Sequence, residues 1–325
     1  TENKKTAVCM EFRTVVDIKK ESNIQHHHKV LMFGSCFTEH IGKKLEQHLF
    51  CVKCNPLGIL FNPASISLSV ERIVQNQKVQ SSELIECDGV WNSFDFHSQF
   101  ARLSEEDYLH NINRQIESTH QFLKECDYIF VTLGTAWIYR IKSTGKVVAN
   151  CHKVPSSHFS RERLSVEDCT KIILHTIEMI KSENPNAKII FTVSPIRHWK
   201  DGAHGNQLSK STLLLAIEEV CQLCDALYFP SYEIVMDDLR DYRFYAGDML
   251  HPNEIAQNYI WEKFCDCFFS EETQSLNKEI NSIRMALLHR PFNPESIGHQ
   301  KFIAQTHTRI KELKEKYPFI QFSNL

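Results

Sequence analysis

Three short apolar runs, each ending at a small residue and followed by helical periodicity, constrain the fold of this chain most. The runs cover residues 29–33, 128–133 and 188–193, and they end at Gly34, Gly134 and Ser194. Runs that are apolar on both faces are typical of strands in parallel sheets that helices cover on each side. The pattern therefore predicts an α/β domain with a parallel sheet, to which a weaker run over 226–229 adds a further strand.

Helical patterns fill the segments between these runs. Residues Ile41, Leu45 and Leu49, for example, recur at spacings of four on one helix face. The expected helices cover 38–49, 63–76, 104–125, 165–182, 206–224 and 253–269. Residues 137–149 instead predict a β-hairpin whose turn lies at 143–145.

The sheet pattern stops near residue 270. Residues 271–325 predict two helices, separated by the segment 289–294, which contains two prolines. We therefore expect one α/β domain over residues 1–270 and a helical C-terminal extension over residues 271–325 that packs on it.

Composition excludes several classes of function. The chain has 325 residues, of which 42% are hydrophobic and 24% charged, and this balance is typical of a globular domain. Its formal net charge of −3 supplies no basic field, so nucleic acid is not an expected partner. No apolar run approaches the roughly 20 residues that a membrane-spanning helix needs.

The 12 cysteines bear on location and on metal binding. Several of them lie in apolar periodic stretches, where a free thiol packs as a small hydrophobe, so we expect a reducing, cytoplasmic setting. The segment 1–5 lacks the apolar core of a signal peptide, although a cleaved one would leave no trace in the sequence. The pairs Cys51/Cys54 and Cys221/Cys224 could form a zinc site, but the second pair lies in a helical apolar pattern, and we expect no metal.

Polar segments follow the apolar runs, at the edge of a parallel sheet where ligands bind. The first of them is Gly34-Ser35-Cys36, between a strand and a helix. A cysteine at a helix N-terminus is favoured as a thiolate, and the backbone N–H groups there can receive an oxyanion. The alternative interpretation is a glycine turn, a serine cap and a packed cysteine.

The segment Asp248–Asn253 carries a second candidate group. His251, three residues after Asp248, can present its imidazole to a nucleophile while the carboxylate holds the other ring nitrogen. An acidic turn with a surface histidine is the alternative interpretation. Arg197 and His198 follow the strand at 188–193 and are candidate substrate-binding residues or structural ion partners.

The order of these segments resembles that of the SGNH (GDSL-type) hydrolases. More specifically, Gly34-Ser35-Cys36-Phe37 resembles the signature of the GSCFA family, a branch of that superfamily. The resemblance extends over roughly residues 10 to 320 through the motifs at 55–58, 62–63, 95–97, 133–137, 150–153, 194–198 and 248–252. It implies a three-layer α/β/α, flavodoxin-like fold with strand order 2-1-3-4-5.

The resemblance also implies roles for individual residues. Cys36 matches the nucleophile position, and Ser35 matches the aspartate that precedes it in the superfamily. Asp248 and His251 match the acid and base of the last motif, and Gly58 matches the glycine whose N–H contributes to the oxyanion hole.

The third motif of the superfamily usually reads Gly-x-Asn-Asp, whereas this chain reads Gly134-Thr135-Ala136-Trp137. The asparagine donor is therefore missing, and Asn62 and Thr135 are the candidates to replace it. Losing one oxyanion donor typically costs on the order of a hundredfold in rate.

The implied function is hydrolysis of an ester or thioester of a small molecule or glycan, or acyl transfer, without metal or organic cofactor. Cys36 would attack the acyl carbonyl, His251 would act as base and then acid, and Asp248 would orient His251. Two alternatives stay open. Ser35 could be the nucleophile, or the altered scaffold could bind a carbohydrate, an acyl ligand or a protein partner without chemistry.

Overall fold

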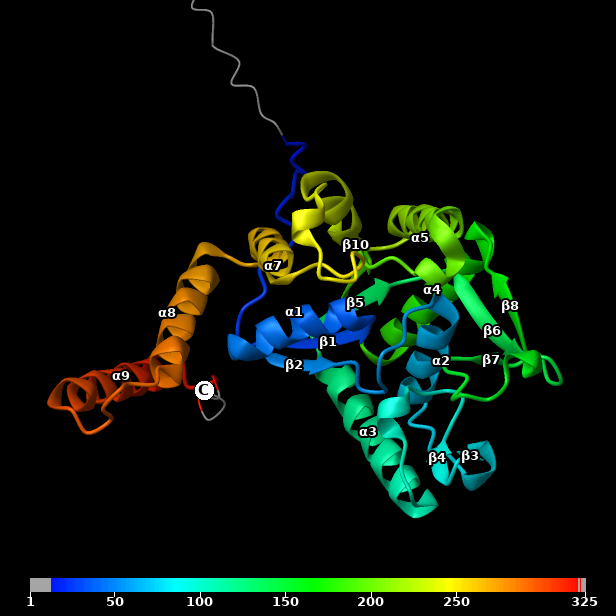
Figure 1. Ribbon diagram of the computed structural model, residues 1–325, viewed down its shortest axis with the longest axis horizontal. Helices are drawn as coiled ribbons and strands as arrows, with labels where there is room; N and C mark the ends of the chain where they lie inside the picture. Colours follow the sequence, from blue (N-terminus) through cyan, green and yellow to red (C-terminus); the bar gives the residue numbers. More distant parts are fainter. Residues whose placement is uncertain (1–12, 321, 323–325) are drawn as a thin grey trace, which may run out of the picture.

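The centre of the protein is a five-stranded parallel sheet, seen in the computed structural model (Figure 1), which describes residues 13–320 and 322. Its strands are β1 (Lys29–Gly34), β2 (Cys51–Cys54), β5 (Tyr128–Leu133), β9 (Lys188–Val193) and β10 (Ala226–Tyr228). They lie in the order β10-β9-β5-β1-β2, and all neighbours are parallel. Counted along the chain this is the order 2-1-3-4-5, which confirms the expected topology. Residues 1–5, which were considered above for a signal peptide, and Cys9, one of the 12 cysteines, lie outside the described residues.

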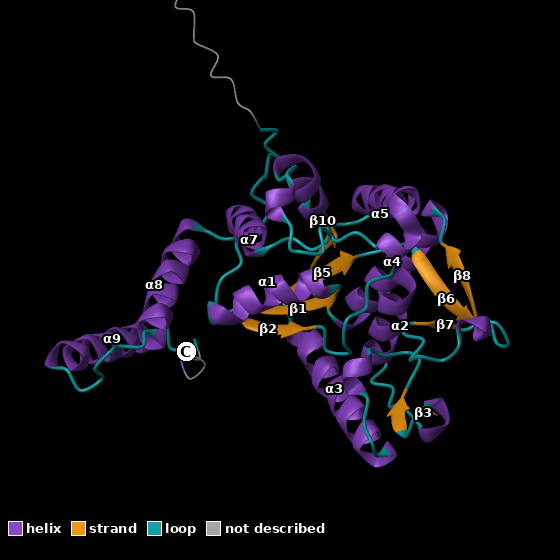
Figure 2. Cartoon of the chain, in the orientation of Figure 1, coloured by secondary structure: helices purple, strands orange, loops and turns teal. Residues whose placement is uncertain are grey.

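Helices cover both faces of this sheet because its side chains alternate between two apolar cores. One core joins strand residues such as Leu31 and Ile129 to α2 (Pro63–Val74), α3 (Glu105–Glu125), α4 (Val166–Glu183) and α5 (Gly202–Leu223). The other joins Val30, Met32 and Phe130 to α1 (Cys36–Gln47) and α7 (Glu254–Phe268). The three-layer α/β/α class is thereby confirmed (Figure 2).

Two small antiparallel sheets flank the central one. The hairpin expected over 137–149 forms from β6 (Trp137–Ile141) and β7 (Val147–Val148), and an unexpected strand, β8 (Phe159–Arg163), pairs with β6 on its other side. A second hairpin joins β3 (Ile85–Cys87) to β4 (Val90–Asn92).

The chain continues after the sheet as the two expected helices, α8 (Glu271–Leu288) and α9 (Ile297–Lys316), which extend to the left of the view in Figure 1. They share a small apolar cluster that includes Ile280, Ile283 and Leu313 and takes in Leu49, just after α1. Among the described residues no helix is long and apolar enough to cross a membrane.

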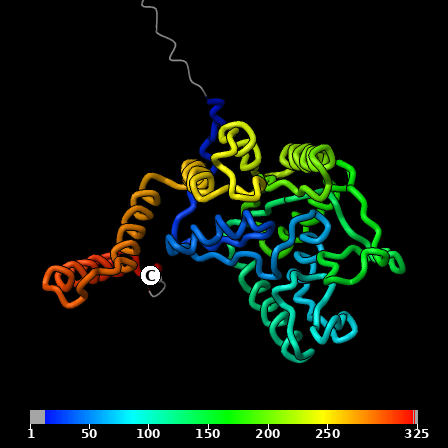
Figure 3. The backbone as a smooth tube through the Cα atoms, in the orientation of Figure 1, coloured from blue at the N-terminus to red at the C-terminus, as the bar shows by residue number. Residues whose placement is uncertain are grey.

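A segment before β1 pairs with the end of α7. Ile24 forms a parallel bridge with Phe269, and its N–H donates to the carbonyl of Phe268 at 2.7 Å. The trace in Figure 3 shows the blue segment that precedes β1 beside the end of α7. The two ends of the sheet domain are thus bonded together.

Candidate active site

The turn between β1 and α1 requires glycine at position 34. Gly34 has φ +147°, and a Cβ there would lie 2.5 Å from Thr38 Oγ1 and 2.6 Å from the Cβ of Thr132 on the neighbouring strand. Its N–H donates to the side chain of Asn55 at 2.9 Å. These contacts place the first residue of α1, Cys36, at the carboxyl edge of the sheet.

Ser35 serves as the N-cap of α1. Its hydroxyl accepts from the N–H of Phe37 at 3.2 Å and donates to Ser194 Oγ, at the end of β9, at 3.1 Å. The residue is only 4% exposed. A capping hydroxyl with two partners, buried in this way, has little freedom to attack a substrate.

Cys36 is half-buried, and its Sγ lies 3.8 Å from Nε2 of His251. Burial raises the pKa of the Cys36 thiol, and the nearby charge of Glu39 raises it further, although the backbone N–H groups of Cys36 and Phe37 act in the opposite direction. The sequence-based expectation of a stabilised thiolate is therefore wrong, because desolvation outweighs the helix N-terminus.

His251 and Asp248 form a compact local unit. Nδ1 of His251 lies 2.5 Å from one carboxylate oxygen of Asp248, and the other oxygen accepts from the backbone N–H groups of Leu250 and His251 at 2.9 and 3.0 Å. These N–H groups, together with the imidazole, lower the pKa of Asp248 to about 2. Asp248 is thus ionised at neutral pH and holds the ring so that Nε2 faces Cys36.

The backbone of Gly58 is already engaged. Gly58 has φ +87°, and a Cβ there would lie 2.3 Å from the Cβ of His97. Its N–H donates to the carbonyl of Asn55 at 2.8 Å. The oxyanion donor that the resemblance implied at this position is therefore occupied by the turn at 55–58.

The two side chains expected to replace the missing asparagine are also committed elsewhere. Asn62 is the N-cap of α2, where it accepts from the Ser65 N–H at 2.8 Å and donates to the Ser65 hydroxyl at 2.9 Å. The Thr135 hydroxyl accepts from the N–H of Trp137 at 3.1 Å and pairs with Ser209 at 2.9 Å. Both contacts are structural, and the structure brings neither group to the site as a spare donor.

Gly134 directly follows β5, and both its N–H and its carbonyl oxygen form hydrogen bonds. Its N–H, like that of Thr135, donates to the carbonyl of Phe61, at 2.6 and 3.2 Å respectively. A Cβ at Gly134 would lie 3.2 Å from Nε2 of His198, so the absence of a side chain admits the His198 ring. That ring also packs on Phe61, with centroids 5.1 Å apart.

His198 is held as a neutral imidazole. Burial, together with the charge of Lys210, lowers its pKa to about 4. Its backbone N–H donates to Asn206 at 3.0 Å, which anchors the loop, while neither ring nitrogen bonds to any described residue. A neutral ring with no internal partner can still donate one N–H to a ligand.

Lys210, on α5, is a residue that the sequence reasoning missed. It is 0% exposed, and its ammonium donates to the carbonyls of Gly134 and Ser194 at 2.6 and 2.7 Å. It thereby joins the carboxyl ends of β5 and β9. Burial, with the nearby charge of Arg197, lowers the pKa of Lys210 to about 7. The available signal was its spacing, because it falls three residues before Leu213 on the buried face of α5.

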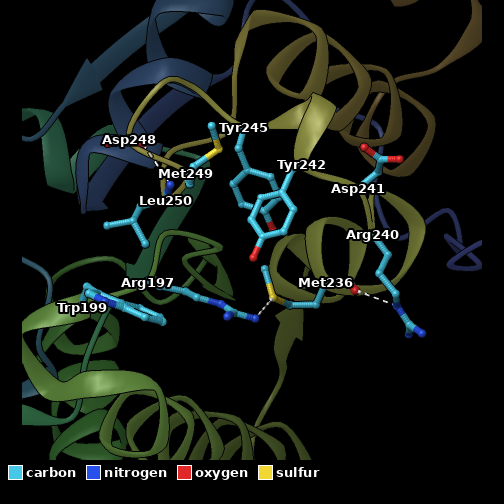
Figure 4. A pocket seen from close by; sticks show the side chains of 10 residues that line it. All are labelled: Arg197, Trp199, Met236, Arg240, Asp241, Tyr242, Tyr245, Asp248, Met249 and Leu250. Atoms are coloured by element: carbon cyan, nitrogen blue, oxygen red, sulfur yellow. Dashed lines mark hydrogen bonds between the residues drawn. The ribbon is translucent and has the colours of Figure 1, made fainter.

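A pocket of about 460 Å³ opens beside the Asp248–His251 loop (Figure 4). Its wall includes Met236, Tyr242, Tyr245 and the loop residues Asp248–Leu250, and Arg197 enters it from the end of β9. The guanidinium of Arg197 contacts the sulfur of Met236 at 3.1 Å. The pocket and the Cys36–His251 pair thus share the loop that carries the histidine.

The two cysteine pairs lie apart. Cys51 and Cys54 belong to β2 at one edge of the sheet, whereas Cys221 and Cys224 lie at the end of α5, which contacts β10 at the opposite edge. Across residues 13–320 no group of three or more His, Cys, Asp or Glu side chains is arranged to hold a metal ion. The single zinc site that would join the two pairs is ruled out by their separation.

Comparison with solved structures finds distant likenesses. A carbohydrate esterase family 3 protein from Talaromyces cellulolyticus is 11% identical, with 78% of this chain and 99% of that chain covered and a TM-score of 0.38. The acetyl xylan esterase Est2A from Butyrivibrio proteoclasticus is 11% identical, with 76% and 64% covered and a TM-score of 0.38. A DUF4886 family protein from Bacteroides uniformis is 13% identical, with 87% and 94% covered and a TM-score of 0.36. These likenesses are too remote to assign an activity.

Comparison with family models is decisive for the family. No curated protein matches the chain. The model described as the GSCFA family matches residues 29–264, and the model described as the C-terminal domain of GSCFA domain proteins matches residues 280–325. Because the first match covers well over half of the 325 residues, the chain belongs to the GSCFA family.

Proposed function

We propose that this protein cleaves acyl esters or thioesters, or transfers their acyl groups, with Cys36 as the nucleophile. The observation that carries the proposal is the continuous array from Cys36 Sγ to His251 Nε2 (3.8 Å) and from His251 Nδ1 to Asp248 (2.5 Å). Nucleophile, base and orienting carboxylate in this order are the arrangement that covalent acyl catalysis requires. We expect the contact of 3.8 Å to shorten when substrate binds, because catalytic contacts are often long in apo structures.

The raised pKa of Cys36 determines how the first step proceeds. The thiol attacks the acyl carbonyl carbon while its proton passes to Nε2 of His251, and the carbonyl π electrons move to the oxygen. Asp248, ionised beside Nδ1, stabilises the resulting imidazolium. Collapse of the adduct expels the alcohol or thiol, which takes the proton from His251 and leaves an acyl-cysteine. Water, or an acceptor alcohol, then attacks that thioester by the reverse proton path.

The oxyanion of this adduct needs donors at the carboxyl edge of the sheet. The N–H of Cys36 is one, because the first residue of a helix has no intrahelical acceptor. We assign the second donor to Nε2–H of His198, which lies over Gly134 at the end of β5. The low pKa of His198 keeps the ring neutral, and a neutral imidazole can polarise a carbonyl without surrendering its proton. His198 would thus replace the asparagine that this chain lacks at Ala136.

The binding scaffold without chemistry is the second candidate function. Two observations favour it: Ala136 stands where the superfamily has asparagine, and the pKa of Cys36 is raised rather than lowered. Under this hypothesis the cleft would retain an acyl or carbohydrate ligand unchanged.

Turnover of a panel of acetyl and butyryl esters and thioesters tests the proposal. The wild type should cleave at least one of them, and intact-protein mass spectrometry should trap one acyl group on Cys36. Cys36→Ala should lose at least about a thousandfold in kcat, whereas the matched variant Ser35→Ala should stay folded with a smaller loss. An active Cys36→Ala protein with an inactive Ser35→Ala protein would give the role to Ser35. A wild type inactive on the whole panel would favour the binding scaffold.

A separate pair of variants tests the donor. His198→Ala should lower kcat by about a hundredfold with little change in KM, because the contact strengthens only in the transition state. His198→Asn, which restores an amide N–H, should recover part of that loss. Equal rates for His198→Ala and wild type would remove His198 from the oxyanion hole.

A further inference from the structure

Arg197 is a cation without a counter-ion in this structure. Its guanidinium forms no ion pair with any described carboxylate, and its Nε is buried without a hydrogen-bond partner. Among the described residues its one polar contact is the sulfur of Met236, at 3.1 Å. Because a thioether is a weak acceptor and contacts another nitrogen of the guanidinium, this contact does not compensate the buried Nε for its lost hydration.

The acidic groups around the pocket are paired with other bases. Asp241 binds Arg243 at 2.8 Å, and Asp248 binds His251 at 2.5 Å. Asp237, on the neighbouring turn, binds Arg240 at 2.5 Å. Each of these three carboxylates is therefore engaged by a base other than Arg197.

A second cation adds to the positive potential. Lys210 is fully buried; its ammonium donates to the carbonyls of Gly134 and Ser194 and lies 5.8 Å from the centroid of the Tyr232 ring, and the described residues give it no ion pair. Arg197 is close enough to contribute to the low pKa of Lys210, so the two positive groups repel each other across the end of β9. An anion in the pocket would relieve this repulsion as well as the isolation of Arg197.

The remaining walls of the pocket are suited to a short carbon chain or a ring. The rings of Tyr242 and Tyr245 lie 5.9 Å apart, and Met236 and Leu250 supply apolar surface beside them (Figure 4). Arg197 enters between these walls with its guanidinium toward Met236. The volume of about 460 Å³ is that of a small-molecule site.

We propose that this pocket binds a carboxylate on the substrate, held by the Nε–H and Nη–H groups of Arg197. Planar guanidinium groups bind carboxylates through two parallel hydrogen bonds, and this geometry would give the buried Nε its missing partner. The proposal rests on the proposed acyl chemistry for its biological meaning. It names the substrate class as carboxylate-bearing acyl esters or thioesters, because the pocket shares its wall with the Asp248–His251 loop.

Ligand binding tests the pocket independently of catalysis. Glutarate should bind the wild-type protein in calorimetric titrations, whereas the neutral isostere glutaramide should bind at least tenfold more weakly. Arg197→Met should weaken glutarate binding at least tenfold, and Arg197→Lys should lie between, since lysine keeps the charge but loses the two-pronged contact. Arg114→Met is the matched control: it removes an exposed arginine of α3, outside the pocket wall, and should bind glutarate within twofold of wild type.

Turnover then locates the carboxylate within the substrate. Glutaryl and butyryl thioesters compare a carboxylate on the acyl side, while O-acetyl glucuronic acid and O-acetyl glucose compare one on the alcohol side. One pair should show at least a tenfold preference for the acid in kcat/KM, and Arg197→Met should abolish that preference. A thermal unfolding scan of each variant confirms that the fold is retained.

The outcomes separate the two proposals. If esters are cleaved but neither pair shows a preference and glutarate binds no better than glutaramide, the carboxylate site is wrong and the acyl chemistry stands. If glutarate binding depends on Arg197 but no ester or thioester is cleaved, the carboxylate site stands and the acyl chemistry is wrong. Equal glutarate affinity in Arg197→Met and Arg114→Met overturns the carboxylate site whatever the turnover.

Discussion

The fold holds the two sides of the candidate site in different ways. On the nucleophile side, Gly34 and Ser35 are bonded to three neighbouring strands or their ends, and no side chain fits at Gly34. On the base side, the side chains of His251 and Asp248 are 46% and 48% exposed and bond chiefly to each other within one loop. The position of the thiol is therefore coupled to global stability, whereas that of the imidazole depends on a local turn.

A substitution on the base side should reduce activity and leave the fold intact. Asp248→Asn removes the charge that orients His251 and stabilises the imidazolium, so kcat should fall by about a thousandfold or more. Because the loop is exposed and bonds chiefly within itself, the protein should stay folded, with a much smaller loss of stability than a substitution in the buried sheet causes. Paired kinetic and urea-denaturation measurements check both statements. A large loss of stability would show that the loop is not the local unit described above.

A substitution in the turn on the nucleophile side should instead reduce the stability of the fold. Gly34→Ala forces a Cβ to within 2.6 Å of Thr132 at a positive φ, so it should cost about 3 kcal/mol of unfolding free energy or prevent folding. Gly145→Ala is the matched control, since Gly145 has φ +72° but nothing within 4 Å of an added Cβ. Denaturant titrations measure both losses. Equal losses would mean that the positive φ alone causes them, and this would contradict the steric argument.

Lys210 makes the nucleophile side sensitive to pH. Its folded pKa of about 7 lies below the ordinary value of 10.5, so between these values the unfolded chain binds more protons and stability rises with pH. Relative to Lys210→Met, the wild type should gain up to about 1 kcal/mol per pH unit between pH 7 and pH 9. Urea titrations of both proteins across this range measure the difference. Parallel curves would show that Lys210 keeps its ordinary pKa.

The smallest effect concerns the thiol itself. The charge of Glu39 raises the pKa of Cys36, so Glu39→Gln should lower that pKa and increase the thiolate fraction at neutral pH. Iodoacetamide should then label Cys36 about two- to threefold faster, as expected for one partly screened charge. Peptide mass spectrometry measures the rate, and buried Cys169, whose pKa is raised to about 12, should stay unlabelled in both proteins. A slower rate in Glu39→Gln would reverse the assigned sign.

The central fold was largely accessible from the sequence because burial on both faces leaves a clear pattern. The strands at 128–133 and 188–193 match β5 and β9 to the residue. β2 was missed, since it has four residues, lies at the sheet edge and carries Lys53 among partly exposed positions. α5 begins at Gly202 rather than near residue 206, so the helix includes Gly202 and Gly205 although glycine has a low helix propensity.

The site residues also divide into those that the sequence pattern indicated and those that only the assembled fold reveals. The rule that ligands gather at the carboxyl ends of parallel strands brought Cys36, His198 and Arg197 into consideration. The hydrogen bonds of Gly58 and Thr135 could not be read from their sequence positions, because they depend on which loop carbonyl or hydroxyl lies opposite. The sign of the Cys36 pKa shift likewise depends on burial, a property of the assembled cleft.

The bridge between Ile24 and Phe269 sets an order of events during synthesis. The segment before β1 is made more than 240 residues before its hydrogen-bond acceptors, Cys267 and Phe268. At about 5–20 residues per second, the segment remains without these partners for roughly 10 to 50 seconds during translation. Over that interval the apolar face of β1 that α7 later covers stays exposed. A nascent chain stalled before α7 should therefore be a good substrate for chaperones, and one stalled well beyond residue 269 a poor one.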